Sequence, residues 1–167
     1  MSYAEFYRRS IEQPEAFWDD QARLIDWHTP YSKVLDYSRA PITNWYVGGT
    51  TNLCHNAIDR HLKDRADQRA LIWVSTEVDK EVIYTYGQLH AEVQKMAAVL
   101  KAQGVGKGDR VLIYMPMIPE AAFAMLACVR IGAIHSVVFG GFASVSLASR
   151  IDDAEPKVIV SADAGSR

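Results

Sequence analysis

The stretch Val111–Gly141, VLIYMPMIPEAAFAMLACVRIGAIHSVVFGG, contains the pattern that decides the fold of this chain. It begins with a short apolar run typical of a buried strand and continues from Pro119 into a mostly apolar helical segment. Proline favours the first turn of a helix, where its missing N–H has no intrahelical partner. The stretch ends in a second apolar run that stops at two adjacent glycines. A strand, a helix and a strand at this spacing predict a parallel crossover unit.

The same alternation continues on both sides of this unit. Upstream, residues 69–75 (RALIWVS) are predicted to form a strand, followed by a short strand and then an amphipathic helix that is capped by Thr85 and stops near Gly104. Downstream, a helix over residues 142–153 leads to a strand at 157–162. The strands are nearly all apolar, which is typical of a sheet buried on both faces. The sequence therefore predicts an α/β fold, a parallel sheet of strand–helix repeats covered by helices.

Residues 1–50 differ from residues 51–167 in their high content of aromatic side chains. Short helical signals occur there, one of them starting near Pro14. Aromatic rings carry large apolar areas and need a surface to pack against. We therefore expect an aromatic-rich N-terminal arm over residues 1–50, without a core of its own, that packs on an α/β body formed by residues 51–167.

Composition excludes several classes of function. The chain has 167 residues and 49% apolar content, enough to bury a core. Its 18 basic and 20 acidic residues give a formal charge of -2 with no long run of either sign, so nucleic acid is not expected as a partner. Two cysteines fit a reducing compartment, and we expect a cytoplasmic protein. No signal peptide or membrane-spanning segment is predicted, so no membrane role is expected.

Three loops follow predicted strands at the edge where open parallel sheets bind ligands. In the first, Pro116 and Pro119 are explained by a fixed turn into a helix. In the second, Gly140 and Gly141 lack a dinucleotide or P-loop pattern, which favours a plain turn, although glycines also let a ligand or a neighbouring backbone come close. The third ends in Arg167, whose guanidinium suits a phosphate or a flat ring but is equally explained as a solvated charge.

Other chemical groups do not form a recognisable site in the sequence. Cys54, His55 and His61 share one predicted helix over residues 53–62, but the two histidines are six positions apart and face different sides, so no metal site is predicted. His135 lies in an apolar strand and is predicted to be a satisfied core histidine. No catalytic triad can be placed from spacing, so no catalytic residue is predicted. Large apolar side chains around the helix that starts at Pro119 are predicted to fill the core: Met117, Phe123 and Met125.

Stretches along nearly the whole chain resemble the N-terminal part of the AMP-forming short-chain acyl-CoA synthetases. The resemblance is carried by FWDDQARLIDW, NWYVGGTTNLCHNAIDRHL, YTYGQLHAEVQKMAAVLKAQGVGKGDRVLIYMPMIPEAAFAMLACVRIGAIHSVVFGGFA, SRIDDAEPKVIVSAD and the closing GSR. Within this family, the short N-terminus beginning YAEFYRRSIEQPEAFW is more similar to propionyl-CoA synthetases than to acetyl-CoA synthetases, which usually have a longer lead.

This resemblance implies a two-step reaction. ATP and a short carboxylate give an acyl-adenylate and pyrophosphate, and the thiol of coenzyme A then displaces AMP, with Mg²⁺ and cationic groups offsetting charge on the phosphates. The family's lysine-bearing Ser/Thr/Gly-rich loop, its carboxylate pocket, its ribose-binding aspartate and its lysine-bearing lid all lie downstream of Arg167. We therefore expect an N-terminal fragment that has no catalytic residue, is inactive alone and binds none of these ligands tightly.

The resemblance also implies site residues for coenzyme A. Gly140 and Gly141 match the family's FGG segment, where the second glycine lines the passage for the pantetheine arm. Arg167 matches the first of two arginines that bind the nucleotide end of coenzyme A, and its partner would lie just beyond it. No metal ligand is implied in this chain.

Other interpretations stay open at this point. The chain could be part of an acetate–CoA ligase, a non-catalytic module that binds coenzyme A or a nucleotide, or an interaction domain whose arm over residues 1–50 docks a partner. In a fragment, apolar faces that pack on the remainder would be exposed, so self-association is also expected.

Overall fold

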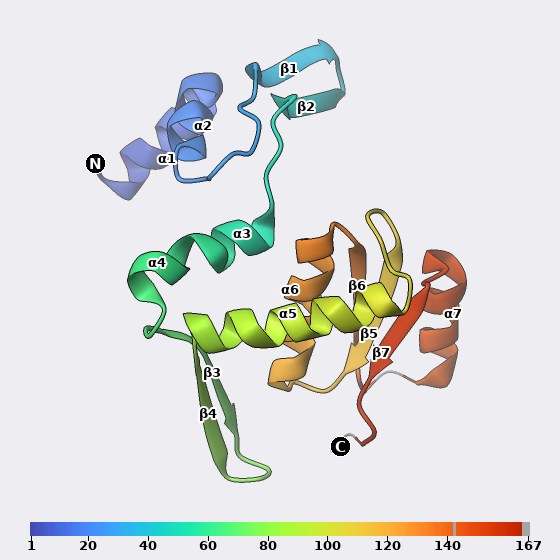
Figure 1. Cartoon of the computed structure of the whole chain (residues 1–167). Helices are drawn as coiled ribbons and strands as arrows, with labels where there is room; N and C mark the ends of the chain where they lie inside the picture. The colour runs from blue at the N-terminus through green and yellow to red at the C-terminus, as the bar shows by residue number, and fades with distance from the viewer. Residues whose placement is uncertain (142, 165–167) are drawn as a thin grey trace. The chain divides into compact units, whose positions relative to one another are not determined.

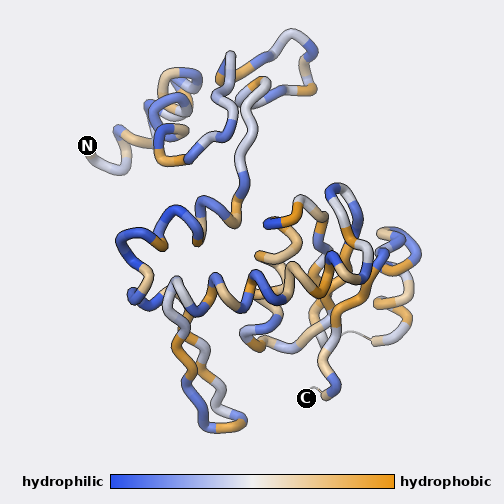
Figure 2. The backbone as a smooth tube through the Cα atoms, in the orientation of Figure 1, coloured by the Kyte–Doolittle hydropathy of each residue, from blue (hydrophilic) through white to orange (hydrophobic). Residues whose placement is uncertain are grey.

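The computed structural model describes residues 1–141 and 143–164, and the chain divides into two units between Asn52 and Leu53 (Figure 1). Within the described residues, no helix combines the length and the apolar character that crossing a membrane requires. Figure 2 shows apolar residues concentrated along the strands of the parallel sheet in the second unit.

The first unit contains two short helices and an antiparallel pair of strands. Their bounds are α1 (Tyr3–Glu12), α2 (Pro14–Ala22), β1 (Lys33–Arg39) and β2 (Ile42–Val47). The helix expected near Pro14 is confirmed, with the proline in its first turn. The two strands were not predicted, because most of their side chains are exposed or half-buried and the sequence shows little alternation between apolar and polar residues.

Aromatic side chains form a small core in the first unit, which corrects the expectation that residues 1–50 have none. Phe17 is 2% exposed, and its ring meets those of Phe6 and Trp18 edge-on, with centroids 4.7 and 5.1 Å apart. Such pairs stabilise a fold beyond the area they bury. A second group of rings, with centroids 5.1 to 5.3 Å apart, is formed by Trp27, Tyr31 and Tyr46.

The second unit begins with a helix that is broken where the sequence predicts a continuous one. Residues 53–62 divide into α3 (Leu53–Ala57), a 3-10 turn η1 (Asp59–His61) and the start of α4 (Leu62–Arg65). The break lies at Ile58, whose backbone angles of φ -128° and ψ -64° leave the helical region. Its side chain is 1% exposed. The local helical pattern is therefore interrupted where a buried side chain enters the core.

Next come β3 (Arg69–Ser75), β4 (Lys80–Thr85) and α5 (Tyr86–Ala102). The helix is confirmed with its predicted cap, since the Thr85 hydroxyl accepts from the Gln88 N–H and the Gln88 side chain accepts from the Thr85 N–H. The strands β3 and β4 pair antiparallel with each other, outside the parallel sheet. Four residues separate them, too few for the crossover that parallel strands need.

The parallel sheet is confirmed for the remaining strands. It has the order β6-β5-β7, with β5 parallel to both neighbours. The elements are β5 (Arg110–Met115), α6 (Pro119–Ile131), β6 (Ile134–Phe139), α7 (Ser144–Ala154) and β7 (Val158–Ser161). Pro119 opens α6 as predicted, and Gly132 ends it in the left-handed conformation at φ +76°.

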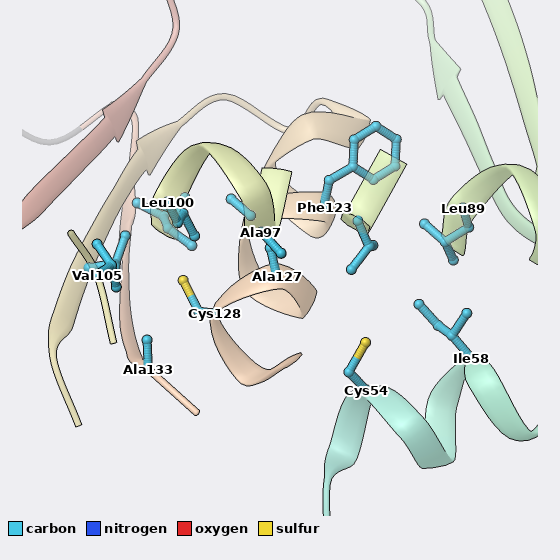
Figure 3. Close-up of a cluster of buried hydrophobic side chains, with 14 residues drawn as sticks. Cys54, Ile58, Leu89, Ala97, Leu100, Val105, Phe123, Ala127, Cys128 and Ala133 are labelled. Atoms are coloured by element: carbon cyan, nitrogen blue, oxygen red, sulfur yellow. The ribbon is translucent and has the colours of Figure 1, made fainter. Parts of the chain in front are cut away.

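Helices cover the sheet on both faces, and the main core lies on the side of α5 and α6. Side chains from α3, α5 and α6 converge there, as Figure 3 shows. The central strand β5 is fully enclosed, since Val111, Leu112 and Ile113 are each 0% exposed. Of these, Leu112 lies outside the α5–α6 cluster, and α7 contacts β5 as well. These observations confirm the predicted α/β class.

Two single-residue predictions need correction or refinement. Phe123 is 5% exposed and fills the core as expected, but Met117 is 82% exposed and lies in the loop before α6, so its assignment to the core is wrong. His135 is half-buried on β6, an edge strand, opposite Val111. Both departures occur at the rim of the sheet, which the hydropathy pattern alone does not distinguish from its centre.

Candidate functional site

The carboxyl ends of the three parallel strands bring the predicted ligand-facing loops to one edge of the sheet. Met115 at the end of β5 is in register with Phe139 at the end of β6, and Tyr114 is in register with Ser161 of β7. The loop Pro116–Ile118 therefore lies beside the loop that contains Gly140. Open parallel sheets bind their ligands at this kind of edge.

Gly140 lets two backbone segments approach each other. A Cβ placed on it would lie 3.2 Å from the Met115 carbonyl oxygen, 3.3 Å from the Met115 carbonyl carbon and 3.4 Å from the Pro116 nitrogen. These are main-chain atoms at the end of the central strand, so they have little freedom to move aside. The neighbouring backbone favours a glycine here, because a side chain would crowd it; this is one of the two reasons that the sequence left open.

Gly141 has a different neighbour. A Cβ placed on it would lie 2.7 Å from Cε1 of the Phe139 ring. Phe139 is 64% exposed, so its ring has room to turn. The space next to Gly141 is thus bounded by a movable side chain at the surface of the sheet edge. The two glycines, identical in sequence, have distinct structural roles.

The β5–α6 loop is held by hydrogen bonds at successive positions. The Ile118 N–H donates to the Pro116 carbonyl at 2.8 Å, and Pro119 then starts α6. The indole N–H of Trp73, on β3, donates to the Met117 carbonyl at 2.7 Å. Trp73 is a residue that the sequence analysis did not single out, because it lies 44 positions from its partner and no local pattern connects the two.

Residues 162–164 follow β7 at the same edge of the sheet. Arg167, the third residue assigned to coenzyme A, lies outside the described residues. The structure thus brings Gly140 and Gly141 together with the β5–α6 loop. It adds nothing on the position of Arg167.

The cysteine and histidines of the predicted helix do not gather into a site. Cys54 is buried beneath Arg130, whose Nη1 lies 3.5 Å from its Sγ, whereas His61 packs on the Tyr86 ring at a centroid distance of 5.1 Å. Burial raises the pKa of the Cys54 thiol and raises that of Cys128 to about 11, so both are neutral near pH 7. No group of three or more metal-binding side chains occurs in the described part of the chain.

Arg130 of α6 is the centre of a polar cluster that joins three elements. Its Nη1 donates to both carboxylate oxygens of Asp59 at 2.8 and 3.0 Å, and its Nη2 lies 3.4 Å from Nε2 of His90 on α5. The Arg130 and Asp59 side chains are each 25% exposed. This cluster connects η1 to α5 and α6, so its charged groups are explained by a role in holding the fold together rather than by a ligand.

A groove of about 650 Å³ lies between the ends of α5 and α6, lined by Ala97, Lys101, Val105, Lys107 and Ile131 among others. Residues 105–107 lead into β5, so the groove lies toward the amino ends of the strands. It is therefore distinct from the loops at the carboxyl edge.

The β5–α6 loop and the turn that contains Gly140 and Gly141 suit ligand lining better than acid–base chemistry, whereas Asp163 after β7 is an ionisable group at the same edge. Residues 115–118 are Met, Pro, Met and Ile, and residues 139–141 are Phe, Gly and Gly. Their side chains carry no ionisable group or nucleophile. Such a surface can contact a slim, uncharged chain closely without binding a charge.

Two family models match consecutive parts of the chain. The model described as AMP-binding enzyme matches residues 58–166, and the model described as acetyl-coenzyme A synthetase N-terminus matches residues 3–57. Together they cover almost the whole sequence and meet close to the division between the two structural units.

Curated relatives match over the full length of this chain but only part of their own. A propionate–CoA ligase of Salmonella typhimurium is 62% identical over 167 residues, covering 100% of this chain and 27% of the relative. An acetyl-coenzyme A synthetase of Methylorubrum populi is 54% identical over 168 residues, covering 99% and 26%. The chain thus spans about a quarter of the length of these relatives.

The fold is also similar to that of a solved structure. An acetoacetyl-CoA synthetase from Streptomyces lividans matches with a TM-score of 0.88 and 32% sequence identity. The match covers 96% of this chain and 25% of that chain. Sequence and structure therefore point to the same kind of protein.

Proposed function

This chain belongs to the AMP-binding enzyme family, and we propose on that premise that it is the N-terminal portion of an AMP-forming acid–thiol ligase. Such a ligase joins a short carboxylate to ATP as an acyl-adenylate, with release of pyrophosphate, and then transfers the acyl group to the thiol of coenzyme A. The observation that carries the proposal is the match of the entire chain to propionate–CoA ligases at 62% and 60% identity. In this proposal residues 1–50 form an N-terminal arm, and residues 51–167 form the first part of the α/β domain.

Propionate is the favoured carboxylate, because acetyl-coenzyme A synthetases match at a lower identity of 54% and below. The test is kcat/KM for propionate and for acetate, measured on the full-length protein that carries this chain. We expect a higher value for propionate. A higher value for acetate would assign the chain to an acetate–CoA ligase instead.

Within the ligase, Gly141 lines the passage for the pantetheine arm of coenzyme A, beside Gly140. The position of Gly141 at the carboxyl edge supports this role, as does the lack of ionisable groups in the adjoining residues 115–118. A side chain at this position would narrow a passage meant for a slim chain. Arg167 would bind the nucleotide end of coenzyme A. The described residues offer no group of three metal-binding side chains, and Mg²⁺ is assigned here only as the companion of ATP.

The passage role is tested in a chimera in which this chain replaces the matching quarter of the Salmonella propionate–CoA ligase. Gly141→Leu is expected to slow thioester formation while propionate-dependent exchange of pyrophosphate into ATP continues. The matched control is Gly106→Leu, because Gly106 lies toward the amino edge and a Cβ there meets nothing closer than 3.7 Å. Equal loss of both partial reactions in Gly141→Leu would refute the passage role.

The 167-residue chain alone is expected to be inactive, because the ATP-binding loop, the carboxylate pocket and the lid are assigned to other parts of the ligase. The measurement is pyrophosphate release from ATP and propionate, with the chimera as the positive control. Release above the background of a sample without protein would contradict this assignment.

Self-association of the isolated chain is expected through apolar side chains exposed on its two edge strands, β6 and β7. Val137 and Phe139 on β6 are 54% and 64% exposed, and Ile159 on β7 is 46% exposed. Exposed apolar strands at a sheet edge favour pairing with another copy. Light scattering should report a mass above that of a monomer, decreased by Phe139→Lys. A monomer mass at all concentrations would contradict the expectation.

A further inference from the structure

Trp73 connects two sheets that, in the described part of the chain, share no strand pairing. It lies on β3 of the antiparallel pair, and its indole N–H reaches the Met117 carbonyl at 2.7 Å, in the loop that follows β5 of the parallel sheet. Its strand neighbours Ile72 and Val74 are 52% and 63% exposed, whereas Trp73 is half-buried. Successive strand residues alternate between faces, so Trp73 shares its face with Leu71, which packs against the core.

The loop that receives this hydrogen bond is also in close contact with Gly140. Met115 and Pro116 contribute the main-chain atoms that lie 3.2 to 3.4 Å from a Cβ placed on Gly140. One residue later, Met117 accepts from Trp73. A shift of the loop by a few tenths of an ångström would therefore be transmitted to Gly140 and to the next residue, Gly141.

The side chain of Met117 is not what fixes its position. Its side chain is 82% exposed, so packing of that side chain contributes little. The flanking Ile118 N–H bonds within the loop itself, to the Pro116 carbonyl. The hydrogen bond from Trp73 is thus a tether between the loop and a separate, hydrogen-bonded strand pair.

We propose that Trp73 is a positioning residue for the coenzyme A passage: its indole N–H holds the Met117 carbonyl, which fixes the β5–α6 loop against Gly140 and sets the width of the passage at Gly141. The inference rests on the proposed role of Gly141. Trp73 touches no reacting atom in this arrangement. It acts through the backbone of the loop.

The first experiment examines the tether without reference to enzyme activity. In the 167-residue chain labelled with ¹⁵N, the Trp73 indole N–H signal is assigned by its loss in Trp73→Phe, a change that keeps an aromatic ring and removes the donor. We expect slow exchange of this N–H with solvent, and shifts of the Gly140 and Gly141 amide signals in the variant. Fast exchange, or unchanged glycine signals, would overturn the inference whatever the enzyme does.

The second experiment separates positioning from simple stability in the chimeric ligase. For Trp73→Phe we expect the KM for coenzyme A to rise about fivefold, the equivalent of one hydrogen bond worth about 1 kcal/mol, with pyrophosphate exchange unchanged. Ile72→Ala, on the exposed face of the same strand, should leave both reactions unchanged. A tryptophan analogue with sulfur in place of the indole N–H, introduced at position 73, removes the hydrogen-bond donor at nearly constant side-chain size and should give the same result as Trp73→Phe.

The outcomes distinguish this inference from the proposed function. If Gly141→Leu slows thioester formation and Trp73→Phe does not, the positioning role of Trp73 is refuted and the passage role of Gly141 is retained. If Trp73→Phe weakens both partial reactions equally, Trp73 only stabilises the fold and the inference is wrong. If neither variant affects the thioester step selectively, the passage role of Gly141 is refuted, and so is the positioning role of Trp73 that rests on it.

Discussion

Replacing each of the adjacent glycines by alanine should give different results, although the two changes are chemically identical. Neither Gly140 nor Gly141 has a positive φ, so the backbone itself accepts alanine at both positions. The new methyl group meets main-chain atoms of Met115 and Pro116 in the first case. In the second it meets the Phe139 ring, which is 64% exposed. The obstacle is rigid for Gly140 and movable for Gly141.

The magnitudes follow from these contacts. Overpacking costs typically about 1–3 kcal/mol, and contacts of 3.2 to 3.4 Å, short by only a few tenths of an ångström, place Gly140→Ala at about 1–2 kcal/mol. Reduced freedom of the unfolded chain offsets about 0.4–1 kcal/mol of this cost in either variant. For Gly141→Ala the remaining cost is a turn of the Phe139 ring, about 0.5–1 kcal/mol, which the same offset nearly cancels. Gly140→Ala should therefore be about 1 kcal/mol less stable than Gly141→Ala.

The assay is amide hydrogen exchange at Val111–Ile113 in the 167-residue chain, because these buried positions of β5 report on the second unit alone. Thermal unfolding followed by circular dichroism should show a corresponding difference of about 2–4 °C in Tm. Equal protection in the two variants, or lower protection in Gly141→Ala, would refute the distinction between a rigid and a movable neighbour.

The other predictions concern ion pairs. The hydrogen bond from the Gly106 N–H, and to a smaller extent that from Lys157, lowers the pKa of Asp109 below 3.8. The ionised Asp109 therefore stabilises the fold above about pH 4, and this contribution is lost as the pH falls through the lowered pKa. The free energy of unfolding should fall more steeply in that pH range in the original chain than in Asp109→Asn, and parallel pH profiles would contradict this. Arg130→Met removes the Nη1 group that donates to both oxygens of the partly buried Asp59 carboxylate, and it should cost about 1–2 kcal/mol. A double-mutant cycle of urea unfolding should show coupling between Arg130→Met and Asp59→Asn; additive effects would show that the pair contributes nothing.

The elements that could be predicted from the sequence are those with strong local signals. Helix α5 has a capping pair at Thr85 and Gln88 and a clear apolar period, and α6 starts at Pro119, so both match the expectation. The break at Ile58 could not be predicted, because it depends on a core formed by residues distant in the sequence. The short connection between β3 and β4 indicates their antiparallel pairing, but the strand–helix alternation around them favoured a parallel arrangement.

The candidate site shows the same division. Its location at the carboxyl edge and the glycine pair itself could be recognised from strand order and composition. The difference between Gly140 and Gly141 could not, since it depends on a Met115 carbonyl and a Phe139 ring that only the folded chain places beside them. The tether from Trp73 to Met117 joins residues 44 positions apart, with no shared motif to connect them.

The strand order β6-β5-β7 also determines the order in which the strands can pair during synthesis. The central strand is made first, and its partners follow only at residues 134–139 and 158–161. Local contacts form before distant ones, so the β3–β4 pair and α5 can be in place while β5 still has no strand beside it on the ribosome. The most deeply buried segment of the second unit therefore has no strand partner until β6 has been made, and its other side stays unpaired until β7 is complete, nearly fifty residues after β5 ends.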